Sequence, residues 1–132
     1  MDSIYKLQIV MDKAKIQFEG KYTYDNIVAA IDNVLVTQLG MLKESDDIYV
    51  GPGTRHDFAK LGKGGLFLAE QSWFSNNVKS MEYYSIDAEY PDSIDQEDWK
   101  KSMIENRRLS AEWHRSIKRP HNGENAGVQT GR

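Results

Sequence analysis

The sequence contains no cysteine among its 132 residues. Disulfide bonds, thiolate metal sites and cysteine nucleophiles are therefore excluded, and the composition fits a reducing compartment. No apolar run approaches the roughly 18 residues that a transmembrane helix needs. The N-terminus MDSIYKLQIVMDK carries an early acid and no apolar stretch of the kind found in signal peptides. We therefore expect a cytoplasmic protein with no membrane partner.

Recognisable catalytic sequence patterns are also absent. Neither G-x-S-x-G nor H-E-x-x-H occurs, and the histidines are His56, His114 and His121. His56 and Asp57 are neighbours, so in a helix their side chains point about 100° apart and do not form a base with its orienting carboxylate. The sequence favours a non-catalytic protein with no metal and no cofactor. The enzymatic alternative is a small hydrolase or transferase that acts on a phosphate-bearing substrate.

The net charge of −3 hides a division along the chain. Residues 1–98 contain 9 Lys and Arg against 17 Asp and Glu, a charge of −8. Residues 99–132 contain 8 against 3, a charge of +5. Because the acidic body would repel an extended polyanion, duplex nucleic acid is a disfavoured partner. A compact anion needs only a local positive pocket. A protein partner could bind either the acidic residues 1–98 or the basic residues 99–132.

Chain length and a hydrophobic content of 39% fit one folded domain, residues 1–119, followed by a flexible tail, residues 120–132. Alternating apolar residues, capping signals and glycines divide the domain into elements. Strands are predicted at Ile4–Met11, Lys13–Glu19, Asp47–Val50 and Val78–Glu89, and helices at Asp25–Leu39, Arg55–Leu61, Leu66–Asn76 and from about Ile94 to Arg119. The predicted fold is α+β: a small antiparallel sheet with one buried helix, a short helical glycine-rich insert and a long C-terminal amphipathic helix.

Two local signals support these boundaries. Asp12–Lys13 is predicted to form a tight hairpin between the first two strands, because Lys13–Glu19 alternates with Ala14, Ile16 and Phe18 on one face. Asp25 is predicted to cap the first helix, which Gly40 ends.

The long C-terminal helix is predicted to begin at the capping signal Ser93–Gln96 and to end before Pro120. About 25 residues at 1.5 Å each make a rod of about 38 Å, which is longer than a small domain is wide. Its far half carries an apolar stripe that would be exposed in a monomer. We therefore predict a homo-oligomer whose interface contains Leu109, Trp113 and Ile117.

A basic arc flanks the apolar stripe of this helix. Arg107, Arg108 and Arg115 are candidate phosphate donors, because the guanidinium fork fits phosphate oxygens. Two alternatives remain open. The arc is either a solvated helix face, or it pairs with the acidic body of its own or a neighbouring subunit.

The stretch GPGTRHDFAKLGKGG does not match the P-loop, because Gly64 follows Gly-Lys where the motif needs Ser or Thr. Thr54 and Asp57 resemble a capping box at a helix N-terminus, where free N–H groups bind anions. Candidate ligand contacts here are Arg55, His56 and Lys63. The alternative is that the glycines only make turns and the helix caps itself.

Aromatic residues offer a further candidate surface, which would stack on a base or sugar or else fill the core: Trp73, Phe74, Tyr83, Tyr84 and Tyr90. Together the patterns predict a non-catalytic binding or regulatory protein for a compact anionic, nucleotide-like ligand. An inhibitor or sequestering protein of a phage or mobile element would have these properties. The non-enzymatic alternative is an inhibitor of protein–protein interaction that uses its acidic body or long helix.

Overall fold

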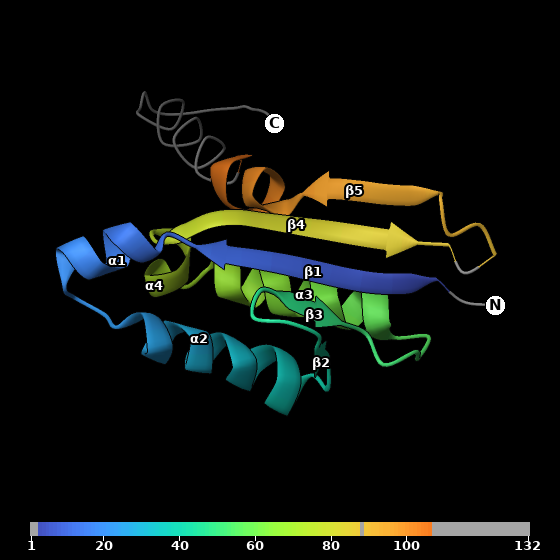
Figure 1. The fold of residues 1–132 in the computed structure, drawn as a ribbon, viewed down its shortest axis with the longest axis horizontal. Helices are drawn as coiled ribbons and strands as arrows, with labels where there is room; N and C mark the ends of the chain where they lie inside the picture. The colour runs from blue at the N-terminus through green and yellow to red at the C-terminus, as the bar shows by residue number, and fades with distance from the viewer. Residues whose placement is uncertain (1–2, 88, 107–132) are drawn as a thin grey trace, which may run out of the picture.

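The alternating residues Ile4–Met11 form β1, the central strand of a five-stranded antiparallel sheet of order β2-β3-β1-β4-β5 (Figure 1). The computed structural model describes residues 3–87 and 89–106. The elements after β1 are α1 (Lys13–Glu19), α2 (Tyr24–Asp32), η1 (Asn33–Gln38), β2 (Leu42–Lys43), β3 (Ile48–Val50), α3 (Asp57–Ala69), α4 (Ser72–Ser75), β4 (Val78–Ile86), β5 (Ile94–Asp98) and η2 (Lys101–Glu105). This is the α+β class that the sequence predicts.

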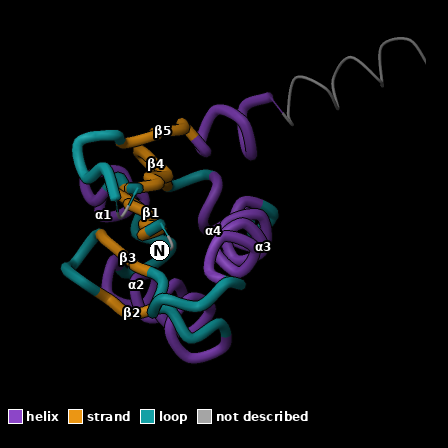
Figure 2. The backbone as a smooth tube through the Cα atoms, turned by 90° about the vertical axis from the view of Figure 1, so that its right-hand side faces the viewer, coloured by secondary structure: helices purple, strands orange, loops and turns teal. Residues whose placement is uncertain are grey.

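The sheet has one buried face and one open face. Residues that pair directly across antiparallel strands share a face, and Leu7 of β1 pairs with Tyr49 of β3 and Tyr83 of β4. All three side chains are buried. Figure 2, which looks along the strands, shows α3 and α4 on one side of the sheet. On the other face, the Tyr84 hydroxyl donates to Gln8 Oε1 at 3.2 Å.

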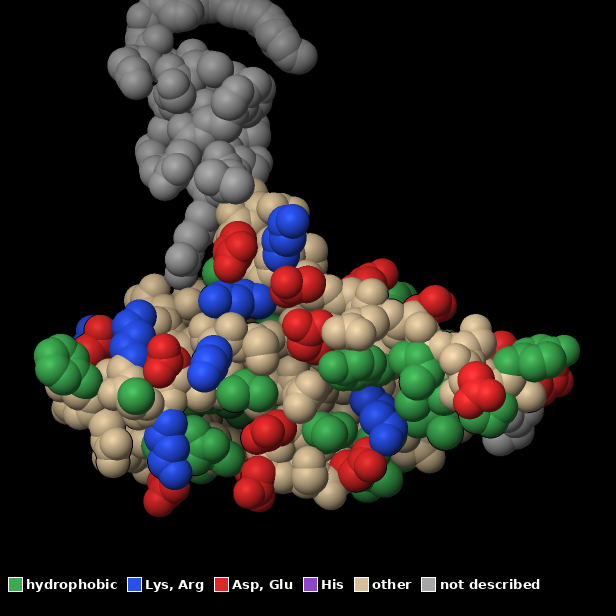
Figure 3. All heavy atoms as spheres, turned by 45° about the horizontal axis from the view of Figure 1, so that its top comes forward, with side chains coloured by type: hydrophobic (Ala, Val, Ile, Leu, Met, Phe, Trp, Pro, Cys, Tyr) green, Lys and Arg blue, Asp and Glu red, His purple; other side chains and the backbone are tan. Residues whose placement is uncertain are grey.

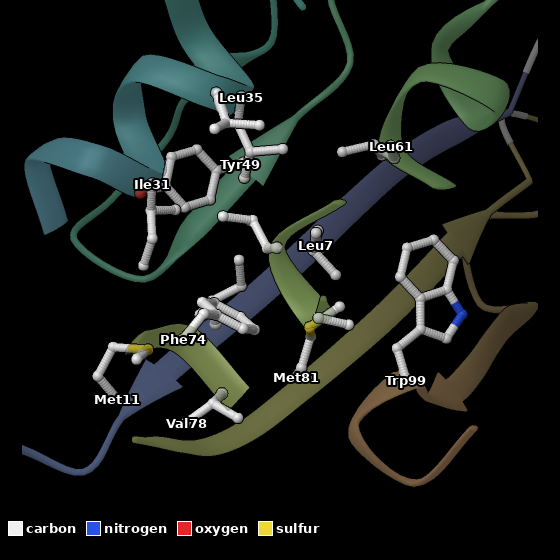
Figure 4. Close-up of a cluster of buried hydrophobic side chains, with 14 of the residues drawn as sticks. Leu7, Met11, Ile31, Leu35, Tyr49, Leu61, Phe74, Val78, Met81 and Trp99 are labelled. Atoms are coloured by element: carbon white, nitrogen blue, oxygen red, sulfur yellow. The ribbon is translucent and has the colours of Figure 1, made fainter. Parts of the chain in front are cut away.

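The hydrophobic core lies between the buried face and the helices (Figure 4). Leu35 of η1, Leu61 of α3 and Phe74 of α4 point toward Met81 and Leu7 on the sheet, and all are fully buried. Among the aromatic candidates, Phe74 and Tyr83 therefore fill the core. Tyr83 stacks on Trp99 with ring centroids 4.6 Å apart, whereas Tyr90 is 67% exposed.

The predicted second strand is wrong, because Lys13–Glu19 is the helix α1. Asp12 does not turn a hairpin. Its carboxylate accepts a hydrogen bond from Lys15 N at 3.1 Å and so caps the helix. Only Ile16 of the apparent apolar face is buried, and Phe18 is 92% exposed. Seven residues fit either periodicity, and the N-cap decides between them.

The first predicted helix is confirmed with a different cap. Thr23 Oγ1 accepts from Asn26 N at 3.1 Å, and Asp25 lies in the first turn. The helix continues from α2 through the π-helical segment η1, and Gly40, with a φ of 77°, follows its end. Tyr49 donates to Asp32 Oδ1 at 2.5 Å, and Lys43 Nζ lies 3.0 Å from both carboxylate oxygens. These bonds tie α2 to β2 and β3.

The predicted break at Gly62 is also wrong, because α3 continues through three glycines to Ala69. At two of these glycines, the lack of a side chain allows close packing. A Cβ on Gly64 would lie 2.6 Å from Leu35 Cδ2, and one on Gly65 would lie 3.1 Å from Met81 Cε. The glycines that read as a loop therefore let α3 approach η1 and the sheet. The predicted helix at Leu66–Asn76 is divided between the end of α3 and the short α4.

The last predicted helix begins later than expected, because Ile94–Asp98 is the strand β5, paired with β4. The capping signal at Ser93–Gln96 is not used. Asp98 Oδ1 instead accepts from Lys101 N at 3.0 Å, and the helical residues begin at Trp99. The remainder of the predicted helix, its basic arc and oligomer interface, and the predicted tail lie outside the described residues.

The glycines of α3 give a matched test of this packing. Gly62→Ala should stabilise the protein by about 0.5–1 kcal/mol, because alanine favours a helix and nothing lies within 4 Å of the added carbon. Gly64→Ala should destabilise it by about 1–3 kcal/mol, because its Cβ would overlap Leu35 and Leu39. Chemical denaturation of both variants measures the difference. Equal effects of the same sign would contradict this account of the packing.

Two buried tyrosines should make the protein sensitive to alkali. Burial raises the pKa of Tyr83 from 10.0 to about 12. Burial and then the Asp32 hydrogen bond raise the pKa of Tyr49. Each hydroxyl therefore contributes stability that is complete below pH 10 and is lost as the pH rises toward 12 and above. Tyrosinate absorbance should show late-titrating groups in the native protein that are missing after unfolding in urea, and Tyr83→Phe should remove one of them.

Candidate functional site

The glycine-rich insert binds one of its own carboxylates. Asp57 is 2% exposed. Its carboxylate accepts from Gly53 N at 2.8 Å, Thr54 N at 3.0 Å and Thr54 Oγ1 at 2.6 Å. A Cβ on Gly51 would lie 2.4 Å from Asp57 Oδ2, so glycine is needed for the backbone to pass here. Thr54 and Asp57 pair as predicted, but the helix begins at Asp57 with His56 as its N-cap and not at Arg55. The Asp57 carboxylate occupies the amide groups that an external anion would use.

The candidate ligand contacts of the insert lie on the surface around this turn. Arg55 Nε lies 3.4 Å from His56 Nε2, and both side chains are exposed. Lys63 is also exposed, about two helical turns or 10 Å further along α3. The structure therefore brings Arg55 and His56 together and separates Lys63 from them. Their role in binding stays a prediction. Other predicted contacts lie outside the described residues: Arg107, Arg108 and Arg115, with Leu109, Trp113 and Ile117 of the predicted interface.

A polar groove occupies the end of the molecule where α1, α4, the start of β4 and η2 meet, at the left in Figure 1. It has two adjacent hollows of about 270 and 370 Å³ that share Lys15, Asn76 and Asn77. The smaller hollow is lined by Asp12, Lys15, Ser75, Asn76, Asn77, Val78, Lys100, Ile104 and Glu105. The larger is lined by Lys15, Glu19, Lys21, Tyr22, Ser72, Asn76 and Asn77.

Asn77 is the buried polar residue of this groove, with 3% of its surface exposed. Its backbone carbonyl accepts from Asp12 N at 2.7 Å, and its side-chain Nδ2 donates to the Trp73 carbonyl at 2.9 Å. The bond to Trp73 fixes the orientation of the amide, because the reversed amide would place two oxygens together. Within the described part of the chain, Asn77 Oδ1 has no hydrogen-bond partner. Such an atom costs about 1–3 kcal/mol until a donor reaches it.

Lysines surround Asn77 at this end of the molecule. Lys15 Nζ donates to the Asn76 carbonyl, Lys21 lies over the Tyr22 ring at 5.6 Å from its centroid, and Lys100 lies 3.8 Å from Glu105. Figure 3 shows lysine and arginine side chains gathered over the left-hand end of the molecule. The Lys100–Glu105 pair is partly exposed and weak, so Lys100 is available to a stronger anionic partner.

Acidic residues limit what the groove accepts. Asp12 is engaged in capping α1, and Glu19 and Glu105 add two further carboxylates to the lining. The groove therefore has ammonium groups at three lysines and carboxylates at three acids, and Asn77 lines it with an acceptor oxygen that is itself buried. This arrangement suits a small molecule that carries both an anionic group and a hydrogen-bond donor.

Sequence reasoning missed the groove because its residues come from three separate segments of the chain. Lys15 was expected on a strand and Lys100 on a long helix, which gave no reason to place them together. The pair Asn76–Asn77 between two elements was the one local signal, since a buried amide at a helix–strand junction needs partners.

Two searches of the described residues gave negative results. No helix in residues 3–87 and 89–106 has the length and apolar character to cross a membrane. Over the same residues, no group of three or more His, Asp or Glu side chains is placed to hold a metal ion.

The internal anion of the insert should matter for stability. Asp57→Ala should destabilise the protein by about 2–3 kcal/mol, because the amides of Gly53 and Thr54 lose a buried charged acceptor. Thermal or urea unfolding measures the loss. The neighbouring Arg55→Ala is the control and should change stability by less than about 0.5 kcal/mol, because Arg55 is exposed. A stable Asp57→Ala variant would show that the loop holds its shape without the carboxylate.

No protein-family model and no curated protein matches this sequence.

Proposed function

We propose that the protein is a non-catalytic binding protein that holds a compact anionic, nucleotide-like ligand in the groove between α1, α4 and η2. The observation that carries this proposal is Asn77, which lines two adjacent hollows with Lys15, Lys21 and Lys100 and whose buried Oδ1 has no hydrogen-bond partner among residues 3–87 and 89–106. A donor on the ligand would satisfy the amide oxygen, and the lysines would neutralise the anionic group.

The two hollows would hold different parts of the ligand. Lys15 and Lys100 line the smaller hollow, which suits a phosphate or carboxylate group. The larger hollow, about 370 Å³, is lined by the half-buried Tyr22 and the exposed Ser72, which suit a ring and its hydroxyl groups. Asn77 lies at the junction and accepts from a sugar hydroxyl or an exocyclic amine. A nucleoside monophosphate has these groups in this order.

The acids of the groove favour a small ligand over a polymer. Glu19 and Glu105 line the two hollows beside the lysines. A polyanion crossing both hollows would pass these carboxylates and be repelled, whereas a single anionic group can contact Lys15 and Lys100 in the smaller hollow, where Asp12 is engaged in capping α1. Binding without turnover is the property of a sequestering or regulatory protein, which is the biological role that we propose.

Thermal shift against nucleoside mono- and diphosphates, cyclic dinucleotides and inorganic phosphate tests the proposal. The matching ligand should raise the melting temperature by mass action, and titration calorimetry should give its affinity. Lys15→Gln should weaken binding by about tenfold, because it removes a charged hydrogen bond without removing the stem of the side chain.

The matched control is Lys60→Gln, an exposed lysine on α3 that lines neither hollow. It should leave the affinity within about twofold of the wild type. Consumption of the ligand during the titration would assign the groove to the enzymatic alternative. Equal loss of affinity in both lysine variants would show non-specific electrostatic binding, and no response to any anion would refute the proposal.

A further inference from the structure

Among the strands that the structure describes, β5 is an edge of the sheet without a second neighbour. In the strand order it lies at one end, beside β4, and all five of its residues are exposed. The opposite edge, β2, is only two residues long. A free edge presents backbone N–H and C=O groups to which another strand can be added. The edge of β5 is the longer of the two by three residues.

The hydrogen-bond pattern identifies which backbone groups point outward. Asp87 N donates to the Ser93 carbonyl at 3.4 Å, so this pair is hydrogen-bonded across the β4–β5 turn. Antiparallel pairs alternate between bonded and non-bonded, and Ile86 pairs with Ile94 and Tyr84 with Gln96. Ile94 and Gln96 therefore direct their N–H and C=O groups away from β4, toward the free side.

The two faces of this edge differ in chemistry. Ile94 is 54% exposed and continues a row of isoleucines across the open face, through Ile86 to Ile4. Asp95 and Glu97 lie on the other face. Residues 87–98 contain six acidic residues and no Lys, Arg or His. Figure 3 shows acidic side chains beside an apolar patch at the right-hand side of the molecule.

A second copy of the chain is a poor occupant of this edge. Antiparallel pairing of two β5 strands about Gln96 would place Asp95 opposite Glu97 of the other copy, twice in each pair. Like charges directly opposite each other destabilise strand pairing. The acids thus protect the edge against self-association and leave it complementary to a basic strand.

We propose that β5 is a docking strand for an extended basic segment of a partner protein, in which basic residues alternate with apolar ones. The partner adds a sixth strand through main-chain hydrogen bonds at Ile94 and Gln96. Its basic side chains face Asp95 and Glu97, and its apolar side chains cover Ile94. This surface lies apart from the groove, so the inference does not depend on the proposed ligand.

A blocked heptapeptide of alternating lysine and valine is the probe, with an alternating glutamate–valine heptapeptide as its charge control. The full-length protein should bind the lysine peptide, measured by fluorescence anisotropy, and should not bind the glutamate peptide. Amide hydrogen exchange should slow at Ile94 and Gln96 when the lysine peptide is added, because their outward N–H groups become hydrogen-bonded.

Gln96→Pro separates main-chain pairing from charge attraction. Proline removes an outward N–H and is tolerated on an edge strand, so β4 and β5 should remain paired. The affinity for the lysine peptide should fall about tenfold or more, through the lost hydrogen bond and the hindered approach. Gln96→Val is the matched control, because it also removes the side-chain bond to Glu82 but keeps the N–H, and should bind as the wild type does.

A second variant with a reversed charge keeps the test decisive if the Gln96→Pro protein does not fold. Asp95→Lys should reverse part of the preference, weakening the lysine peptide and strengthening the glutamate peptide. Equal binding of the two peptides, or unchanged binding in both Gln96→Pro and Asp95→Lys, would overturn the proposal. Amides of Ile94 and Gln96 already protected in the protein alone would also overturn it, because a second copy or residues 107–132 would then occupy the edge.

Discussion

The close approach of α3 to η1 and the sheet is the constraint on which the rest of the structure depends. It is possible because Gly64 and Gly65 have no side chains where a Cβ would meet Leu35 and Met81. With α3 at this distance, one layer of helices covers one face of the sheet and buries the core residues of β1 and β4. None of the described helices covers the other face or the β5 edge.

Both candidate surfaces lie where this layer ends. The groove forms beyond the end of the core, where α1, α4 and η2 meet around Asn77, and its lining contains both lysines and carboxylates. The β5 edge lies outside the cover of α3, and its acids make it locally negative. The net charge of −3 therefore describes neither surface. The mixed charge of the groove and the acidic edge of β5 differ, so the two surfaces suit different partners.

The sequence predicted the elements with the longest regular patterns, and also the short strand β3. Eight alternating residues define β1, and the Tyr- and Ile-rich run defines β4. One face of each strand is buried, so apolar residues recur at every second position. It failed at α1 and β5, which are seven and five residues long. At that length a cap or a neighbouring strand outweighs local preference. The glycines of α3 were misread because their reason is a contact with residues distant in sequence. The groove was missed for the same reason, because its residues are also distant from one another in the sequence.

One junction connects the two surfaces. β5 ends at Asp98, whose carboxylate caps the helical segment that follows, and this segment contributes Lys100 and Glu105 to the groove. Trp99 lies between Asp98 and Lys100 in the sequence. Its indole N–H donates to Glu97 Oε1 at 2.9 Å, and its ring stacks on Tyr83 in the core. A strand added to β5 and a ligand at Lys100 therefore act on the same short segment from its two ends. Whatever coupling this segment transmits is reciprocal, because each occupant changes the binding free energy of the other by an equal amount.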